Sequence, residues 1–182
     1  MNFKEKTLIK NYVYNGKIMN VRCDTVELPT GNTSKREIVE HNGGSCILCE
    51  RDGKILFVKQ HRYAYGEDIW EIPAGKLNVG EDPMETARRE LEEEGGIYAE
   101  NLDLMFTVYP TPGYSAEIIR VYRATGLKEV PMHLDPDEFL TGEWIEIDKV
   151  KQMIATGEIK DGKTLIALLG YFSGIVGNDK LV

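Results

Sequence analysis

Residues 75–97 read GKLNVGEDPMETARRELEEEGGI, and the sequence changes its pattern inside this stretch. Asp82 is a typical helix N-cap followed by an acid at capping-box spacing, and Pro83 suits the first helical turn. The Gly95–Gly96 pair is typical of a helix C-terminus. We therefore predict a helix over residues 82–94, enclosed by two glycine-containing segments.

The predicted helix is strongly acidic. Together with the residue before it, the helix holds seven acids and two bases, a net charge of −5 out of −8 for the whole chain. At 100° per residue, Glu90, Glu93 and Glu94 share one face of the helix. Met84 and Leu91 form an apolar stripe next to that face. We therefore expect the helix to hold its acidic face against the body of the protein.

Carboxylates that share a partly shielded face need a countercharge, because two like charges 4 Å apart repel by about 4 kcal/mol at an effective dielectric constant of 20. We do not expect Arg88 and Arg89 to reach every carboxylate of the helix. A hard divalent cation such as Mg²⁺ or Mn²⁺ can, because it binds carboxylate oxygens. The alternative is a solvated acidic surface without metal. The spacing of the acids leaves both interpretations open.

The composition of the 182 residues is that of an ordinary globular protein, with 42% hydrophobic and 29% charged residues. The acidic balance argues against nucleic acid and anionic membranes as partners. No apolar run is long enough to span a bilayer, and the first residues do not resemble a signal peptide. The three cysteines make an odd number, so we expect reduced thiols and a cytoplasmic location.

The motif Cys46-Ile47-Leu48-Cys49 has the spacing of a redox or zinc site. Its two apolar central residues instead indicate a buried strand. In a strand, residues three apart point to opposite faces of the sheet. We therefore expect both thiols to be structural.

Alternating and β-branched runs predict a strand-rich chain with two further helices after residue 147. The expected strands are Thr7–Tyr14, Lys17–Leu28, Lys35–His41, Ser45–Glu50, Lys54–Gln60, Ile69–Ile72, Leu102–Tyr109, Glu117–Ala124 and Glu143–Ile147. The expected closing helices are Asp148–Ala155 and Lys163–Val176. Asn15-Gly16 and Arg51-Asp52-Gly53 indicate hairpins, and Pro73-Ala74-Gly75 indicates a break. The pattern predicts an α+β fold or a mixed α/β sandwich, with residues 1–40 as a separate N-terminal β arm.

The order Gly75, Glu81, Arg89-Glu90-Leu91, Glu93-Glu94, Gly96-Ile97 is similar to every specified position of the Nudix hydrolase box. The preceding Trp70–Ala74 also resembles that family. The resemblance implies an α/β/α sandwich with a Nudix-type mixed sheet over residues 41–182. It also implies a loop–helix–loop metal site and the hydrolysis of a nucleoside diphosphate linked to another group.

The resemblance assigns roles by position. Direct metal ligands would be Glu90, Glu94 and the carbonyl of Ala74. Glu93 would be a further ligand or a base, and Glu81 would assist the site. Arg89 would orient the glutamates through charge-assisted hydrogen bonds. Gly75 and Gly96 would permit the turns at the two ends of the helix.

Other segments resemble the ADP-ribose pyrophosphatase subgroup. Pro112 lies 16 residues after Gly96, as a proline does in that subgroup. The loop around Pro112 and Gly113, with Glu117, resembles the one that closes over the terminal ribose. Arg62 stands where an arginine contacts the pyrophosphate, and its planar fork suits phosphate.

Residues 135–138 resemble the subgroup's catalytic loop, although Pro136 replaces an acid. The general base is therefore open among Glu138, Asp137 and Glu93, and we favour Glu138. This subgroup would hydrolyse ADP-ribose to AMP and ribose 5-phosphate with Mg²⁺ or Mn²⁺.

The resemblance further implies a homodimer that exchanges its N-terminal arms, with residues such as Arg36 near the adenine of a neighbour's substrate. Two alternatives remain. One is a Nudix pyrophosphatase for another nucleoside diphosphate sugar or nucleotide. The other is an ADP-ribose-binding sensor without activity.

Overall fold

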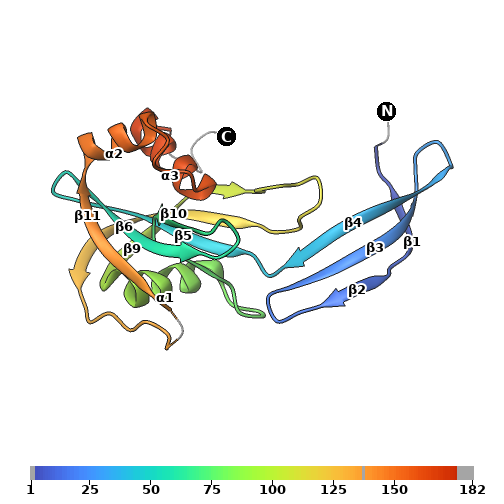
Figure 1. The fold of residues 1–182 in the computed structure, drawn as a ribbon, viewed down its shortest axis with the longest axis horizontal. Helices are drawn as coiled ribbons and strands as arrows, with labels where there is room; N and C mark the ends of the chain where they lie inside the picture. The colour runs from blue at the N-terminus through green and yellow to red at the C-terminus, as the bar shows by residue number, and fades with distance from the viewer. Residues whose placement is uncertain (1–2, 137, 176–182) are drawn as a thin grey trace. The chain divides into compact units, whose positions relative to one another are not determined.

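The structure is a computed structural model that describes residues 3–136 and 138–175. The expected end of the last helix, Val176, and the candidate base Asp137 lie outside the described residues. The chain forms two compact units, which Figure 1 draws together. One unit contains residues up to 43 together with 109–118, and the other contains residues 44–108 and those from 119 onward.

The first unit is an antiparallel sheet in which a central strand pairs with all three others. Its strands are β1 (Lys6–Ile9), β2 (Tyr12–Asn15), β3 (Met19–Glu27) and β4 (Thr33–His41). The sequence predicted one strand over β1 and β2. The structure divides it at Asn11, whose backbone N–H donates to the buried Asp24 carboxylate at 3.2 Å. The loop 109–118 packs here, since the Val39 N–H donates to the Tyr114 carbonyl at 2.8 Å.

The second unit is built on a seven-stranded mixed sheet with the strand order β11-β6-β5-β10-β9. Strand β7 pairs with β6, and β8 pairs with β5. Only the β5–β10 pairing is parallel within the described part of this sheet. Its strands are β5 (Gly44–Arg51), β6 (Lys54–Arg62), β7 (Glu67–Glu71), β8 (Ala74–Lys76), β9 (Ile97–Val108), β10 (Ile119–Glu129) and β11 (Leu140–Glu146). The expected break at 73–75 therefore contains a short strand.

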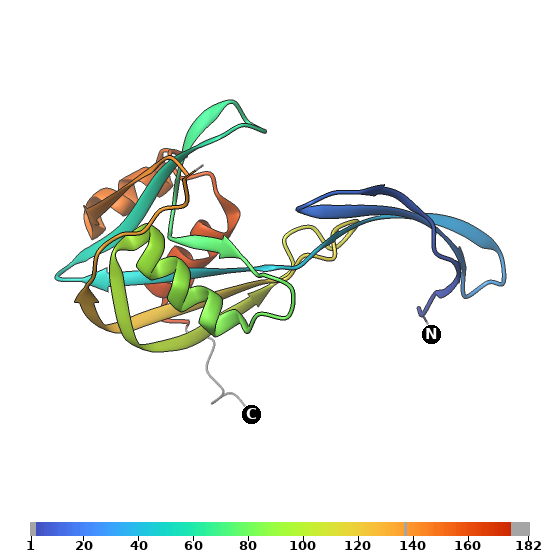
Figure 2. The ribbon, with the colours of Figure 1, turned by 90° about the horizontal axis from the view of Figure 1, so that it is seen from below.

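Helices cover both faces of this sheet (Figure 2). Helix α1 (Pro83–Gly95) covers one face, while α2 (Ile147–Ala155) and α3 (Gly162–Ser173) cover the other. Strand β5 alternates between them, because successive side chains point to opposite faces. Cys46 packs with residues of α2 and α3, whereas Cys49 packs with residues of α1. These three layers confirm the predicted α/β/α sandwich.

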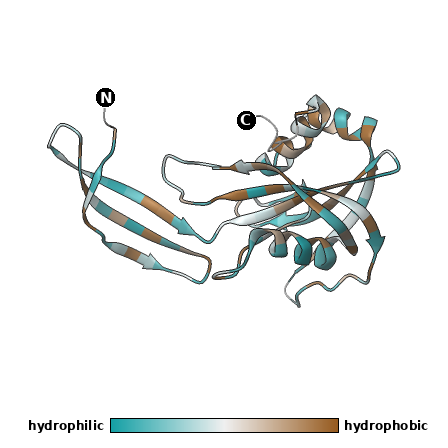
Figure 3. Cartoon of the chain, turned by 180° about the vertical axis from the view of Figure 1, so that it is seen from behind, coloured by the Kyte–Doolittle hydropathy of each residue, from teal (hydrophilic) through white to brown (hydrophobic). Residues whose placement is uncertain are grey.

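The residues of α1 are mostly hydrophilic, whereas those of α3 are largely hydrophobic (Figure 3). The two thiols of the Cys-x-x-Cys motif are buried on opposite faces, as the strand pattern predicted. Burial raises the pKa of Cys46 and of Cys49 to about 12. Neither thiol is therefore available as a thiolate at neutral pH. No helix among the described residues is long and apolar enough to cross a membrane.

Candidate active site

Helix α1 begins at the predicted cap. The Asp82 side chain accepts hydrogen bonds from the backbone N–H of Met84 at 2.8 Å and of Glu85 at 3.3 Å. The Ser45 hydroxyl of β5 donates to the Pro83 carbonyl at 2.7 Å, which fixes the start of the helix against the sheet. Gly96 ends the helix with φ of 61°, in the left-handed region that favours glycine.

The buried face of α1 differs from the expected one. Met84 is 39% exposed and takes no part in the core, so the predicted apolar stripe was wrong at that end. The side chains that α1 buries are Thr86, Ala87, Glu90, Leu91 and Glu94. Glu90 and Glu94 therefore lie on the buried stripe itself, with residue exposures of 6% and 3%.

Residue 75 has to be glycine because the side chain of Glu90 packs closely against its backbone. A Cβ atom at this position would lie 1.8 Å from Oε1 of Glu90. Gly75 belongs to β8, and its φ does not require glycine, so the expected turn at this residue was wrong. The carboxylate of Glu90 thus occupies the space that any other side chain at residue 75 would take.

Ala74 offers both of its backbone polar groups to the side facing α1. The Ile47 N–H donates to the Pro73 carbonyl at 2.9 Å, so Ala74, opposite Cys46, falls in a non-hydrogen-bonded pair of the β5–β8 ladder. Its N–H instead donates to Oε2 of Glu94 at 2.9 Å. Because the N–H and C=O of one strand residue point to the same side, the Ala74 carbonyl also faces away from β5.

Arg89 contacts several carboxylates but not Glu94, in line with the expectation that the arginines do not reach every carboxylate. Its Nε atom donates to Glu81 at 3.0 Å, and its Nη1 atom donates to both Glu90 and Glu93 at 2.8 Å. We call Glu81, Arg89, Glu90, Glu93 and Glu94 the α1 cluster. Three of its four carboxylates share Arg89, and Glu94 makes no ion pair with it.

Burial sets the electrostatics of the α1 cluster. Desolvation raises the pKa of Glu90 to about 7 and that of Glu94 to about 8. The charges of Glu93 on Glu90 and of Glu90 on Glu94 raise these pKa values further, and the charge of Glu138 adds a smaller contribution to both. The outer carboxylate, Glu81, behaves oppositely, because its hydrogen bond from Arg89 lowers its pKa to about 2.

The donors in this cluster fit a hard divalent cation. Within the described residues, no group of three or more His, Cys, Asp or Glu side chains is arranged to hold a metal ion. The set that fits instead combines two side chains, Glu90 and Glu94, with the backbone carbonyl of Ala74. All three are oxygen donors, which Mg²⁺ and Mn²⁺ prefer. Both carboxylates are buried, and a cation would supply the charge that Arg89 does not give to Glu94.

A second charged cluster lies in the same unit, around the end of β7. Glu71, which is 2% exposed, accepts hydrogen bonds from Nε of Arg62 at 2.5 Å and from Nη2 at 2.7 Å. Lys163 of α3 donates to the same carboxylate and to Asp161 at 3.0 Å. We call Arg62, Glu71, Asp161 and Lys163 the β7 cluster. Its two acids and two bases balance.

The remaining predicted site residues lie in the first unit. Pro112 and Gly113 are exposed in the loop 109–118. Glu117 lies 3.2 Å from Nδ1 of His41. Arg36 donates to Glu5 through two nitrogens and to the Ser34 hydroxyl at 3.1 Å.

Sequence reasoning missed Glu71, Asp161 and Lys163. Only Glu71 carried a usable signal, because it is the one charged residue in the expected strand Ile69–Ile72. A buried charge has to be paired, so such a position predicts a basic partner without identifying it.

Comparison with known proteins agrees with this architecture. Residues 39–168 match the family described as NUDIX domain. Residues 5–39 match the nucleoside diphosphate sugar hydrolase N-terminal domain. A crystal structure of an ADP compounds hydrolase superposes with a TM-score of 0.82 at 18% identity, covering 94% of each chain. At that identity, the likeness is one of fold.

Two relatives are similar over nearly the whole chain. The methanol dehydrogenase activator of Bacillus methanolicus is 43% identical, with 91% of each chain covered. The ADP-ribose pyrophosphatase of Bacillus subtilis (strain 168) is 41% identical, again with 91% of each chain covered. The family match covers most of the chain, and both relatives match it almost end to end. The chain belongs to the Nudix family.

Proposed function

We propose that this protein hydrolyses the pyrophosphate bond of ADP-ribose, giving AMP and ribose 5-phosphate, in a reaction that depends on Mg²⁺ or Mn²⁺. The observation that carries the proposal is the convergence of two buried carboxylates on one peptide segment. Glu90 fills the space beside Gly75, and Glu94 accepts the N–H of Ala74. An oxygen-donor site of this kind suits a cation that binds a diphosphate.

The protein's own residues would divide the work. Glu90, Glu94 and the Ala74 carbonyl would hold the cation, which when bound neutralises diphosphate charge and lowers the pKa of a water molecule. Arg89 holds Glu90 and Glu93 in place by hydrogen bonds of 2.8 Å. Its contact with Glu81 anchors it from the other side.

Two further residues would contact the substrate or the attacking water. Arg62 would bind the diphosphate, because its guanidinium group keeps donors that Glu71 does not use. Glu138 would accept the proton of the attacking water, and its charge already acts on Glu90 and Glu94. Glu93 is the alternative base.

The choice of substrate rests on relatives. The B. subtilis relative is named an ADP-ribose pyrophosphatase, and it covers 91% of this chain. The description of the N-terminal match, a nucleoside diphosphate sugar hydrolase domain, favours a second candidate: another nucleoside diphosphate sugar. The two differ in the group beyond the diphosphate, where we propose that Pro112, Gly113 and Glu117 make contacts.

We further propose that residues 1–40 are a dimerisation arm. Strands β1 and β2, which both pair with β3, expose large apolar side chains, and an exposed apolar patch of this kind is typical of an interaction surface. Leu8, Ile9, Tyr12, Val13 and Tyr14 are each 45–59% exposed. In the dimer, Arg36 would lie near the adenine of a substrate. Light scattering at micromolar concentration is expected to give twice the mass of 20.6 kDa, and a monomer would contradict the arm's role.

We also propose a cytoplasmic location. All three cysteines are free among the described residues, as expected in a reducing compartment. The net charge of −8 makes nucleic acid and anionic membranes unsuitable partners.

Hydrolysis of ADP-ribose in ¹⁸O-labelled water tests the reaction. We expect AMP and ribose 5-phosphate in equal amounts, with one labelled oxygen in one of the two products. A panel of nucleoside diphosphate sugars, read by nucleotide release, identifies the preferred substrate. Substitution Glu138→Gln tests the base, because a lost general base typically lowers kcat by about 10²- to 10⁴-fold. Full activity of that variant would transfer the role to Glu93.

A further inference from the structure

Glu71 is a buried charge held by two cations that come from two different elements of the second unit, β6 and α3. Arg62 at the end of β6 donates to it through two nitrogens, and Lys163 in the first turn of α3 donates to the same Oε2 atom. The hydrogen bonds from Arg62 and the charge of Lys163 lower the pKa of Glu71 against the cost of its burial. Glu71 is therefore an ionised carboxylate with a fixed orientation.

The start of α3 fixes Lys163 in turn. Asp161, the N-cap of α3, accepts from Lys163 at 3.0 Å and from the Thr164 hydroxyl at 2.6 Å. That hydroxyl accepts from the backbone N–H of Ile72 at 3.0 Å. The segment that carries Glu71 is thus attached to α3 through both its side chain and its backbone.

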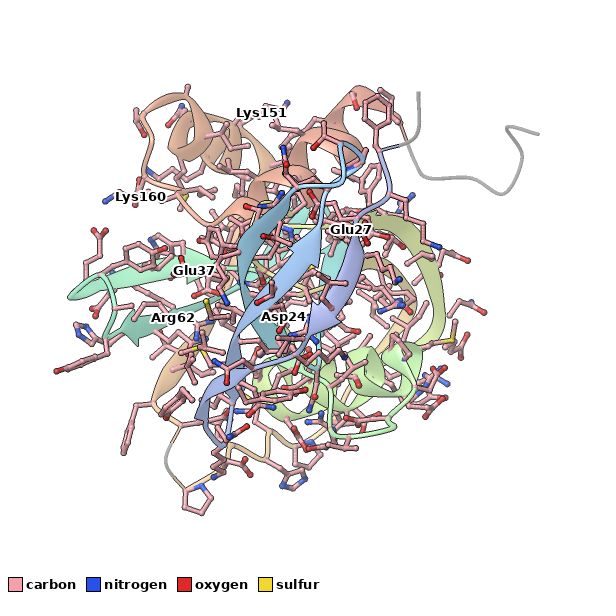
Figure 4. All side chains as sticks on the ribbon, turned by 90° about the vertical axis from the view of Figure 1, so that its right-hand side faces the viewer. Asp24, Glu27, Glu37, Arg62, Lys151 and Lys160 are labelled. Atoms are coloured by element: carbon pink, nitrogen blue, oxygen red, sulfur yellow. The ribbon has the colours of Figure 1, made fainter. Side chains whose placement is uncertain are left out.

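Arg62 uses only part of its guanidinium group on Glu71. The bonds from Nε and Nη2 occupy one edge of the group. Among the described residues, Nη1 has no hydrogen-bond partner, and the side chain is 39% exposed. The free edge is therefore available for a second anion, in the planar geometry that matches phosphate. Arg62 is labelled in Figure 4.

The charge balance of the β7 cluster decides whether Arg62 still attracts an anion. Without the Lys163 ammonium, Glu71 and Asp161 would outnumber Arg62 by one charge. With Lys163 present, the cluster is neutral, and Lys163 shares the Oε2 atom of Glu71 with Arg62. Lys163 thereby helps to fix the orientation of the Arg62 guanidinium group. It also balances the second acid of the cluster, so that the positive charge of Arg62 can still attract an anion.

We propose that Lys163 is a positioning residue for diphosphate binding, which acts on Arg62 through the shared carboxylate of Glu71. The inference rests on the proposed function, since it assigns Arg62 to the diphosphate. It adds that the affinity for substrate is set in part by the first turn of α3, a helix outside the Gly75–Ile97 motif.

The test compares Lys163→Met with Lys160→Met at saturating Mg²⁺. Lys160 is a matched control, because it lies three residues earlier and pairs with Glu67 at 2.7 Å, but is 56% exposed. Both substitutions remove one positive charge. We expect Lys163→Met to raise the KM for ADP-ribose about ten-fold, equivalent to about 1.4 kcal/mol, with kcat within about two-fold of wild type. Lys160→Met is expected to leave both constants unchanged.

A double variant separates positioning from simple stabilisation. Lys163→Met alone leaves a buried carboxylate under-compensated and lowers the free energy of unfolding. Adding Glu71→Gln removes that charge, so thermal stability is expected to recover. The glutamine offers only one acceptor oxygen to Arg62, so the KM is expected to remain high. Recovery of the KM together with stability would overturn the proposal.

The outcomes for the two levels of inference are distinct. If wild type does not hydrolyse ADP-ribose, the proposed substrate fails, and the same variants are measured on the nucleoside diphosphate sugar that wild type does hydrolyse. The KM effect is expected there too, because Arg62 would bind the diphosphate common to all of them. If wild type hydrolyses ADP-ribose and the two lysine variants have the same KM, the positioning role of Lys163 is wrong and the proposed function stands.

Discussion

The α1 cluster and the β7 cluster use the same residue types for opposite purposes. The α1 cluster sets four carboxylates against one arginine, and Glu94 is outside its ion pairs. The β7 cluster sets two carboxylates against two cations, and its buried Glu71 is held from both sides. One cluster keeps an excess of negative charge, whereas the other is neutral.

This difference in net charge indicates which cluster is satisfied by its own members. A neutral buried network is satisfied by its own members, and it can hold one of them in a fixed orientation for another task. In a buried cluster with an excess of carboxylates, the carboxyl pKa values are raised as long as no cation is bound. The raised pKa values of Glu90 and Glu94 are an example. We therefore read the α1 cluster as a receptor for a cation and the β7 cluster as a support for an anion-binding arginine.

We expect the strongest loss of activity from a substitution at Glu94 in the α1 cluster. The substitution Glu94→Gln removes a proposed ligand, and we expect kcat for ADP-ribose to fall by about 10²- to 10⁴-fold at saturating Mg²⁺. Glu92→Gln is the control, because Glu92 belongs to the same helix and lies outside the buried set. Equal kcat values for the two variants would remove Glu94 from the site.

Addition of Mg²⁺ tests whether the excess negative charge of the α1 cluster binds a cation. If the α1 cluster receives a cation, Mg²⁺ at about 100 times its Kd stabilises the wild type by about 2.7 kcal/mol, which is a rise in Tm of several degrees. Glu94→Gln is expected to lose this rise, and Lys163→Met is expected to keep it. Differential scanning calorimetry with and without EDTA measures both. An Mg²⁺ response that depends on the β7 cluster instead would reverse our assignment.

Substitution Gly75→Ala tests the close approach beneath the α1 cluster. The new Cβ would overlap the Glu90 carboxylate, which has to move, and a displacement of this size is expected to lower kcat about ten-fold or more. Gly162→Ala is the control, since a Cβ there meets nothing within 4 Å. The control is expected to keep its activity, and a wild-type kcat for Gly75→Ala would contradict the geometry.

The smallest expected effect is the acid response of the β7 cluster. The lowered pKa of Glu71 gives stability that is present above the ordinary value of 4.5 and is lost as the pH falls through the lowered value. The double variant Glu71→Gln with Lys163→Met lacks this contribution. Urea unfolding across acidic pH is therefore expected to show the wild type losing stability more steeply than the double variant. Parallel curves would mean that Glu71 is not ionised in the folded protein.

Sequence reasoning reached the two clusters unequally. The α1 cluster is local, because all its members fall within 14 residues of one helix and the turn before it. Spacing placed Glu90, Glu93 and Glu94 on one face, and the resemblance added Glu81 and Arg89. Two details of the cluster depend on the pairing of β8 with β5: the space beside Gly75 and the N–H of Ala74. A short strand that pairs far along the chain has no periodicity to predict it.

The β7 cluster is non-local. Glu71 and Lys163 are 92 residues apart, and no spacing rule connects a strand end with the first turn of a distant helix. The fold class followed from the order of strand and helix patterns, and the resemblance implied the α/β/α layers. Strand β5 lies at their centre, because each of its faces meets a different helix layer. Individual ion pairs across layers follow only from the packed structure.

The backbone of Ala74 connects two of the proposed metal donors. Its N–H fixes the carboxylate of Glu94, and its own carbonyl is the third proposed donor. Two donors of the site are thus anchored to a single residue, so a shift of β8 translates both together and leaves their separation nearly constant. The distance between these two donors is set by the covalent geometry of Ala74 and by one hydrogen bond. Substitutions that shift β8 should therefore keep these two donors together.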